Sequence, residues 1–509
     1  MQNEYKRIQQ DCVNESVLAE CSEEFILPDY LPEIRRVLRL ETHLVKGECF
    51  TSGKRASFDG TVLYTLFYTD TEEKLTSVPL ESRYSYELSL PTEMPLFLYS
   101  EENVEAVNMR PLGPRRVSIR TKLRARVHAV TEEVAEGPLG ELLPEGCTVP
   151  EVIYKESRVL HRTHVQSESA EGVADWMLEG VSAESVRPLY GSADVLIERA
   201  SAERGHVILR GVLAFRLMLE KEGEAITLSR RVPFEEALIA DCKEGDLVSA
   251  WGCARSVELS LEEKGEGLSL SARAHYTLEA LCERNEALSL LNDLYATTHT
   301  LTLKRRPVHM SELLGGVFGG YTAECDVTVN DGDSVPLASV SVKGAEVKTE
   351  GRRVVLSGEL RADLLCFGGE ADARVYRAEE ALFPFRIESE LPEEILPTDR
   401  IRYTLVPLGT EVVTDGERAH VSTELSLSLC ALRDAEHAAA EGIVAEEKAA
   451  RDMTVLTVVY PTDSDSLWSV GKTYGVSLRE LLKKNGLSYD EELSPDSPKT
   501  LDGIAWMFV

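Results

Sequence analysis

The sequence predicts a mainly β protein, with three repeated antiparallel β-sandwich-like domains followed by a small α+β (βααβ) module. Two observations support this. A pattern of about 150 residues recurs three times, and each copy is rich in strand and turn signals. The end of the chain instead carries helix-capping signals. The expected parts are domains at 1–150, 151–290 and 291–433, a spacer at 434–453 and the terminal module at 454–509.

The composition is that of a folded, multidomain protein. The 509 residues exceed what one core normally holds, and 43% of them are hydrophobic. The net charge of −32 repels phosphate backbones, so no nucleic-acid partner is expected. No stretch is apolar over ~18 residues and the first residues are polar, so neither a transmembrane segment nor a signal peptide is expected. Ten scattered cysteines without a Cys-x-x-Cys pair suggest free thiols in a reducing cytosol.

The clearest landmark of the repeat is an apolar run that starts with glycine. The three copies are Gly60–Tyr68, Gly211–Leu219 and Gly358–Cys366. Each run has the length and composition of a β-strand. We therefore expect the three glycines to begin equivalent strands.

Each copy continues with a proline between apolar residues, at Pro79, Pro233 and Pro384. Proline cannot donate a ladder hydrogen bond, so these strands are expected at sheet edges or at strand starts. The closing strands alternate between apolar and polar residues, which indicates one buried and one solvated face; they are 117–123, 268–274 and 419–425. A β-sandwich and a strongly curved sheet are both compatible with this pattern.

Two segments around the repeats suggest helix. In the first copy, Pro32 is expected to open a short helix that places Ile34, Val37 and Leu38 on the sheet. After the third copy, the alanine- and glutamate-rich residues 434–453 predict a frayed helical spacer, interrupted by Gly442. Cleavage near Gly442 is expected to release a folded terminal module.

The terminal module is expected to begin with a strand at Thr454–Tyr460. Asp465 is expected to cap a first helix, with Leu467, Val470, Gly471 and Tyr474 on one face. Ser477–Glu480 forms a capping box for a second helix, which Asn485 and Gly486 end. In the closing strand, 500–509, the alternating residues are Ile504, Trp506 and Phe508.

These elements resemble the LysM family, whose motifs correspond here to Leu467–Val470, Tyr474–Ser477 and Leu481–Leu487. The resemblance implies a βααβ fold in which loops beside the helices hold carbohydrate. Both loops depart from the family pattern, at 464–466 and at 493–499, because the usual glycines are missing. The candidate partner- or glycan-binding residues are Asp465, Ser466, Leu467, Trp468, Ser469, Lys472, Asn485, Gly486 and Leu487.

The full layout resembles the clostridial spore-coat morphogenetic proteins, which combine a repeated SPOCS β domain with one C-terminal LysM domain. The segment Phe25–Leu38 and the order of the repeats carry this resemblance. It implies a cytoplasmic location in the mother cell, at the forespore surface and spore coat. The implied partners are the coat morphogenetic ATPase and spore coat proteins.

Chemistry-bearing motifs are weak by comparison. His161 and His164 lack an evident third metal ligand, and Leu314–Gly320 has glycines but no following Lys-Ser/Thr, so it is interpreted as a flexible turn. The basic island Arg110–Arg126 is interpreted as the solvated face of an edge strand, with an acidic protein partner as the alternative. Neither an enzyme nor a cofactor or metal is expected.

The sequence therefore favours a non-enzymatic assembly adaptor whose LysM module tethers it to a protein partner. In this hypothesis, exposed parts of Trp468 and Leu487 anchor the partner. The alternative is a protein that binds peptidoglycan, cortex carbohydrate or chito-oligosaccharide through the same module. An enzyme with its site in a β repeat is the third, least favoured, hypothesis.

Overall fold

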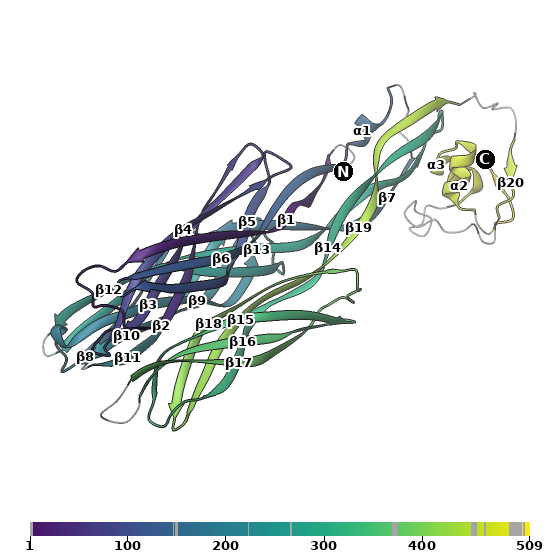
Figure 1. Ribbon diagram of the computed structural model, residues 1–509. Helices are drawn as coiled ribbons and strands as arrows, with labels where there is room; N and C mark the ends of the chain where they lie inside the picture. The colour runs from purple at the N-terminus through teal and green to yellow at the C-terminus, as the bar shows by residue number, and fades with distance from the viewer. Residues whose placement is uncertain are drawn as a thin grey trace.

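The protein is an elongated β body with a small helical module near one end (Figure 1). The computed structural model describes residues 4–145, 147, 151–221, 223–264, 267–368, 375–448, 456–462, 465–487, 501 and 504–509. The prediction of a mainly β protein with several antiparallel sheets is confirmed.

The first domain is a sandwich of two three-stranded sheets, ordered β1-β6-β5 and β2-β3-β4. Phe58 and Tyr64 of one sheet pack with Ile119 and Leu123 of the other in a single core, so the sandwich is the correct alternative to a curved sheet. The strands are β1 (Lys6–Ile26), β2 (Arg36–Ser52), β3 (Arg55–Thr69), β4 (Leu75–Ser89), β5 (Phe97–Gly113) and β6 (Arg116–Glu136).

The same order of strands recurs twice. In the second domain β7 and β8 both pair with β13 and together occupy the place of β1. Its strands are β7 (Glu151–Gln166), β8 (Ala170–Glu179), β9 (Val186–Glu203), β10 (His206–Lys221), β11 (Glu224–Ile239), β12 (Leu247–Lys264) and β13 (Gly267–Tyr295). The third domain comprises β14 (His299–Thr328), β15 (Ser334–Glu350), β16 (Arg353–Gly368), β17 (Val375–Glu390), β18 (Arg400–Asp415) and β19 (Arg418–Glu447). A short helix, α1 (Leu139–Leu142), and a 3-10 turn (Ala183–Ser185) lie between strands.

The three glycines occupy the same place in β3, β10 and β16, the central strands of their sheets. They do not begin these strands, as the sequence suggested, but lie inside them opposite a β-bulge in the neighbouring strand. A Cβ would lie 2.0 Å from the Leu196 carbonyl oxygen at Gly211 and 1.9 Å from the Gly344 carbonyl oxygen at Gly358. Close backbone approach therefore explains the glycine in the second and third domains, whereas a Cβ at Gly60 would meet the Tyr84 side chain.

The prolines lie on edge strands, as predicted, in β4, β11 and β17. Their positions are equivalent only in the second and third domains, where each proline directly precedes the residue that pairs with the glycine. In the first domain Pro79 pairs with Thr65, further along β3. The closing strands β6, β13 and β19 alternate between buried and more exposed residues as expected.

The helix expected at Pro32 does not form. The segment between β1 and β2 is an irregular loop whose carbonyl groups are already engaged: the Arg115 guanidinium donates to Pro28 O and Leu31 O, and the Tyr68 hydroxyl donates to Pro32 O. Ile34 still packs on the core of the first domain. Side-chain donors from the sheet thus replace the hydrogen bonds of a helical turn.

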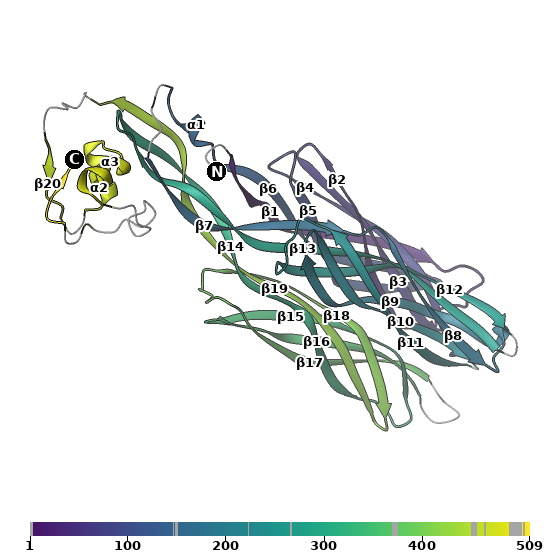
Figure 2. The same cartoon turned by 180° about the vertical axis from the view of Figure 1, so that it is seen from behind.

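The helical spacer prediction is wrong over its described part. β19 continues to Glu447 and pairs with β14 along almost its whole length (Figure 2). Ala439, Ala440 and Ile443 are buried against other domains, so tertiary contacts outweigh the helix propensity of this sequence. Residues 449–453 lie outside the described residues.

The three domains meet at a buried carboxylate, Glu136, which is 2% exposed. It accepts hydrogen bonds from Lys6 Nζ (2.8 Å), from Leu291 N of the second domain (3.0 Å to Oε2) and from Ala440 N of the third (3.0 Å). Both backbone donors lie next to bulged residues, Asn292 and Glu441, which interrupt the ladders there. One side chain therefore joins β6, β13 and β19.

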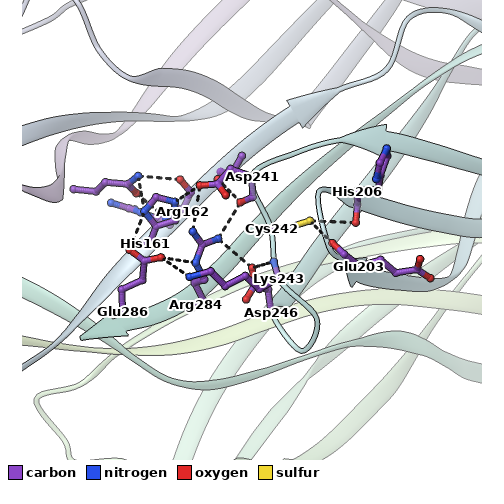
Figure 3. A network of polar contacts seen from close by, with 12 residues as sticks. His161, Arg162, Glu203, His206, Asp241, Cys242, Lys243, Asp246, Arg284 and Glu286 are labelled. Carbon is purple, nitrogen blue, oxygen red and sulfur yellow. Dashed lines mark hydrogen bonds and ion pairs between the residues drawn. The ribbon is translucent and has the colours of Figure 1, made fainter. Parts of the chain in front are cut away.

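A second set of polar contacts fixes the first domain and the β11–β12 loop on the second domain (Figure 3). Arg284 of β13 pairs with Asp241, Asp246 and Glu286 at 2.8–3.2 Å. Gln9 of β1 accepts a hydrogen bond from Arg162 N at 2.7 Å. These contacts make the domain interface specific in orientation.

Candidate functional site

The terminal module has two short helices on one face of a two-stranded antiparallel sheet. Its elements are β20 (Val458–Val459), α2 (Leu467–Tyr474), α3 (Leu478–Asn485) and β21 (Met507–Phe508). Its core contains Leu467, Val470, Leu481, Leu482, Met507 and Val509. The last strand alternates as expected: Met507 and Val509 are buried against the helices, and Trp506 and Phe508 lie on the other side.

Local capping defines both helices. The N-cap of α2 is Ser466 and not Asp465: Ser466 Oγ accepts from Ser469 N (3.1 Å), and Ser469 Oγ accepts from Ser466 N (2.8 Å). Asp465 instead accepts from the backbone and hydroxyl of Thr462, both at 2.8 Å. Ser477 caps α3 as predicted, with Oγ accepting from Glu480 N at 3.2 Å, but the Glu480 carboxylate pairs with Lys484 at 2.9 Å and does not complete the predicted capping box.

Three predicted site residues have structural roles at the end of α3. The Asn485 side chain donates to Leu481 O and Phe508 O at 2.8 Å and accepts from Phe508 N at 2.6 Å, so it ties α3 to β21. Gly486 has a φ of 64°, the left-handed conformation that favours glycine at a helix end. Leu487 packs on the module core.

Trp468 is 8% exposed, so the expectation of an exposed anchor at this residue is wrong. Its indole Nε1 donates to Asp293 Oδ2 at 2.8 Å, and its ring packs edge-on against Tyr295 with centroids 4.9 Å apart. Lys472 Nζ pairs with Asp293 Oδ1 at 2.6 Å. Both predicted residues therefore bind the end of β13 in the same chain.

The contact between module and body is close. The Tyr295 hydroxyl donates to Val476 O at 3.0 Å, and a Cβ on Gly471 would lie 2.4 Å from that hydroxyl oxygen. Burial would raise the pKa of Asp293, but hydrogen bonds from Lys472 and Trp468 outweigh it and lower the pKa. The module is thus docked on the second domain. The sequence predicts instead a module that folds independently of the β domains.

The side of the two-stranded sheet that faces away from α2 and α3 is exposed and apolar. Leu456 is 73% exposed, Tyr460 74% and Trp506 51%, and the Trp506 and Phe508 rings meet edge-on at 5.0 Å. We call Leu456, Val458, Tyr460, Trp506 and Phe508 the outer apolar face. Alternation within 456–460 was the signal in the sequence that could have identified it. Exposed clusters of this kind mark interaction sites.

The structure describes only part of the two loops on which the glycan hypothesis depends. Ser464 and residues 493–499 lie outside the described residues. Asp465 and Ser466 make the contacts given above, and both are committed to the fold of the module.

The other sequence candidates do not form a site. The basic island lies largely on β6, a central and not an edge strand, where Arg116, Arg120 and Arg124 pair with carboxylates of neighbouring strands. The glycines of 314–320 belong to β14 and not to a turn. His161 contacts Asp241 and His164 contacts Glu279, at 3.2 and 3.3 Å. In the described part of the chain, no three His, Cys, Asp or Glu side chains gather as a metal site would require.

Comparisons of this chain with protein-family models, with curated proteins and with solved structures found no match. Within the ranges that the structure describes, every helix is too short or too polar to cross a membrane.

Replacing Asp293 with alanine is expected to undock the module. It removes the acceptor of Trp468 and the ion-pair partner of Lys472, and a hydrogen bond to a charged group contributes ~1.5–3 kcal/mol. The undocked population should rise about ten-fold or more, seen as faster hydrogen exchange at Tyr295 and α2. Asp326→Ala, which removes an exposed partner of His420, is the control. Unchanged exchange in the Asp293 variant would contradict the docking.

Proposed function

We propose that the protein is a non-enzymatic assembly adaptor whose terminal module presents one protein-binding surface and whose β domains present others. The observation that carries this proposal is the outer apolar face on a module docked by its opposite side. Because Trp468 and Lys472 hold the helices on β13, the sheet is the side turned outward. A rigidly presented apolar face with aromatic side chains resembles the anchors of protein interfaces.

The setting of this proposal comes from the resemblance in the sequence. The LysM-like motifs and the repeated SPOCS-like β domains suggest spore-envelope assembly, in the mother-cell cytoplasm at the forespore surface. The proposed partners are the coat morphogenetic ATPase and spore coat proteins. The order β20-α2-α3-β21 agrees with a LysM assignment and supports this part of the proposal.

The structure changes which residues we assign to the partner. Trp468 holds the module in place, while Tyr460 and Trp506 of the outer apolar face replace it as proposed anchors. Leu487 is half-buried in the module core and contributes little free surface. An aromatic anchor at the centre of an interface typically contributes ~2 kcal/mol or more.

Affinity capture of the coat ATPase from sporulating cells tests the proposal. With the full chain as bait, Tyr460→Ser combined with Trp506→Ser is expected to weaken capture about thirty-fold or more. Tyr30→Ser, which changes an even more exposed tyrosine in the first domain, is the matched control and should leave capture unchanged. Capture that survives the double substitution would reject the outer apolar face as the anchor.

Titration of the full chain with chito-oligosaccharide or a muropeptide distinguishes carbohydrate binding from the proposed protein binding. We expect no saturable binding at millimolar concentration. A clear isotherm, together with no capture of the ATPase, would favour the carbohydrate-binding function.

A further inference from the structure

Two cavities lie side by side between the first and second domains, on either side of one arginine. Arg255 of β12 lines both. The first cavity, about 470 Å³, is strongly polar and contains the carboxylates of Asp59, Glu102 and Glu279. The second, about 650 Å³, is mainly apolar. Both volumes are in the range of small-molecule sites, ~300–1,000 Å³.

Arg255 reaches this place because it is a bulged residue. The register of β12 on β13 shifts between Ala254 and Ser256, which takes Arg255 out of the ladder. The bulge also presents Ala254 O to the first domain, where it lies 2.6 Å from His43 Nε2. Bulges that redirect a side chain are frequent next to binding sites.

Within the described part of the chain, Arg255 has neither a carboxylate partner nor a hydrogen bond, and its Nε is fully enclosed. The nearby arginines differ. Arg39 pairs with Glu41, and Arg216 lies 3.7 Å from Asp194. Arg255 as a whole is half-buried, so its charge keeps some contact with solvent, but a buried Nε–H without an acceptor is costly. An anionic group beside Arg255 would therefore be stabilising.

The rest of the second cavity selects for an apolar body. Its other basic group is His43, whose pKa is lowered by burial but raised to about 9 overall by Cys253 and the Ala254 carbonyl. The hydroxyls of Thr42, Thr65, Ser192 and Ser256 are its small polar groups. Two carboxylates border it: Glu41 is held by Arg39, and Glu81 is exposed. The apolar lining is Phe25, Leu63, Pro79, Leu80, Ala193 and Val257.

We propose that the second cavity binds a small amphipathic anion, with one carboxylate-like head on Arg255 and an aliphatic body among the apolar residues. A nucleotide fits poorly, because its phosphates carry more negative charge than Arg255 and His43 offset, and they would approach the carboxylates of the first cavity. The proposed site is separate from the terminal module and does not depend on the adaptor proposal.

Calorimetric titration of the full chain with decanoate tests this site. Physiological salt is used because the net charge of −32 repels anions at low ionic strength. We expect saturable one-to-one binding, and binding at least ten-fold weaker for decanol, which keeps the aliphatic body but lacks the charge. This comparison uses the unsubstituted protein, so it does not depend on a variant folding.

Substitutions then locate the ligand. Arg255→Met is expected to weaken decanoate binding about ten-fold or more and to leave decanol binding unchanged, whereas Arg210→Met, an exposed arginine paired with Glu235, should change neither. Thr42→Trp should fill the second cavity and abolish binding; Ser100→Trp, in the first cavity, should not. Absence of saturable decanoate binding, equal affinities for decanoate and decanol, or loss only with Ser100→Trp would each overturn the proposal.

Discussion

Replacing Gly358 with alanine is expected to destabilise the third domain by ~3 kcal/mol or more. The added Cβ would lie 1.9 Å from the Gly344 carbonyl oxygen and 2.9 Å from the Phe385 ring, so either β15 or β16 must move. Overpacking against backbone is costly because the ladder cannot rotate away as a side chain can. Urea unfolding followed by circular dichroism measures the loss.

The expected loss of stability differs between the three repeated glycines. Gly211→Ala should cost a similar amount, because its Cβ meets the Leu196 carbonyl oxygen. Gly60→Ala should cost less, because its nearest neighbour is the end of the Tyr84 side chain. Gly319→Ala on β14 is the control, since nothing lies within 4 Å of its Cβ. Equal effects at Gly358 and Gly319 would refute the close-approach explanation.

Replacing Glu136 with leucine should destabilise the junction of the three domains by ~3–5 kcal/mol. The substitution leaves the Lys6 ammonium and the amides of Leu291 and Ala440 buried without their acceptor. The three domains should then no longer unfold together, which differential scanning calorimetry would show as separate transitions.

Two further variants serve as an intermediate case and as a control for Glu136→Leu. Glu136→Gln keeps a carbonyl acceptor but loses the charge that faces Lys6, so it should have an intermediate effect. Glu132→Ala removes an exposed partner of Arg7 and should change stability by less than ~1 kcal/mol. If Glu136→Leu melted like the unsubstituted protein, the junction would not depend on this carboxylate.

The sequence was most informative where the constraint is local. Periodic apolar residues in β6, β13 and β19 and the caps at Ser477 and Gly486 depend on near neighbours, and they were predictable. The repeated glycines were recognised, but their place inside a strand depends on a bulge in another strand, which periodicity does not reveal.

The predictions that were wrong concern residues whose structure depends on partners far away in the sequence. Residues 434–447 have helix-forming composition, yet β14 supplies a strand partner more than a hundred residues earlier. Trp468 matches a surface motif, yet Asp293, remote in sequence, covers it. Arg255 was not recognised in the sequence for a similar reason, because much of the cavity beside it is lined by the first domain. Contacts between distant segments therefore separate the predicted site from the observed one.

The long ladder between β14 and β19 has a mechanical consequence. Its strands pair from His299 with Glu447 to Thr328 with Arg418, and the terminal module comes after β19 in the sequence and lies near the end of the body where β1 begins (Figure 1). A pull on the module directed along the strands loads these hydrogen bonds in shear, so that many must break together. A pull across the strands would instead open the same ladder one pair at a time. The β14–β19 ladder therefore resists tension along its strands better than tension across them.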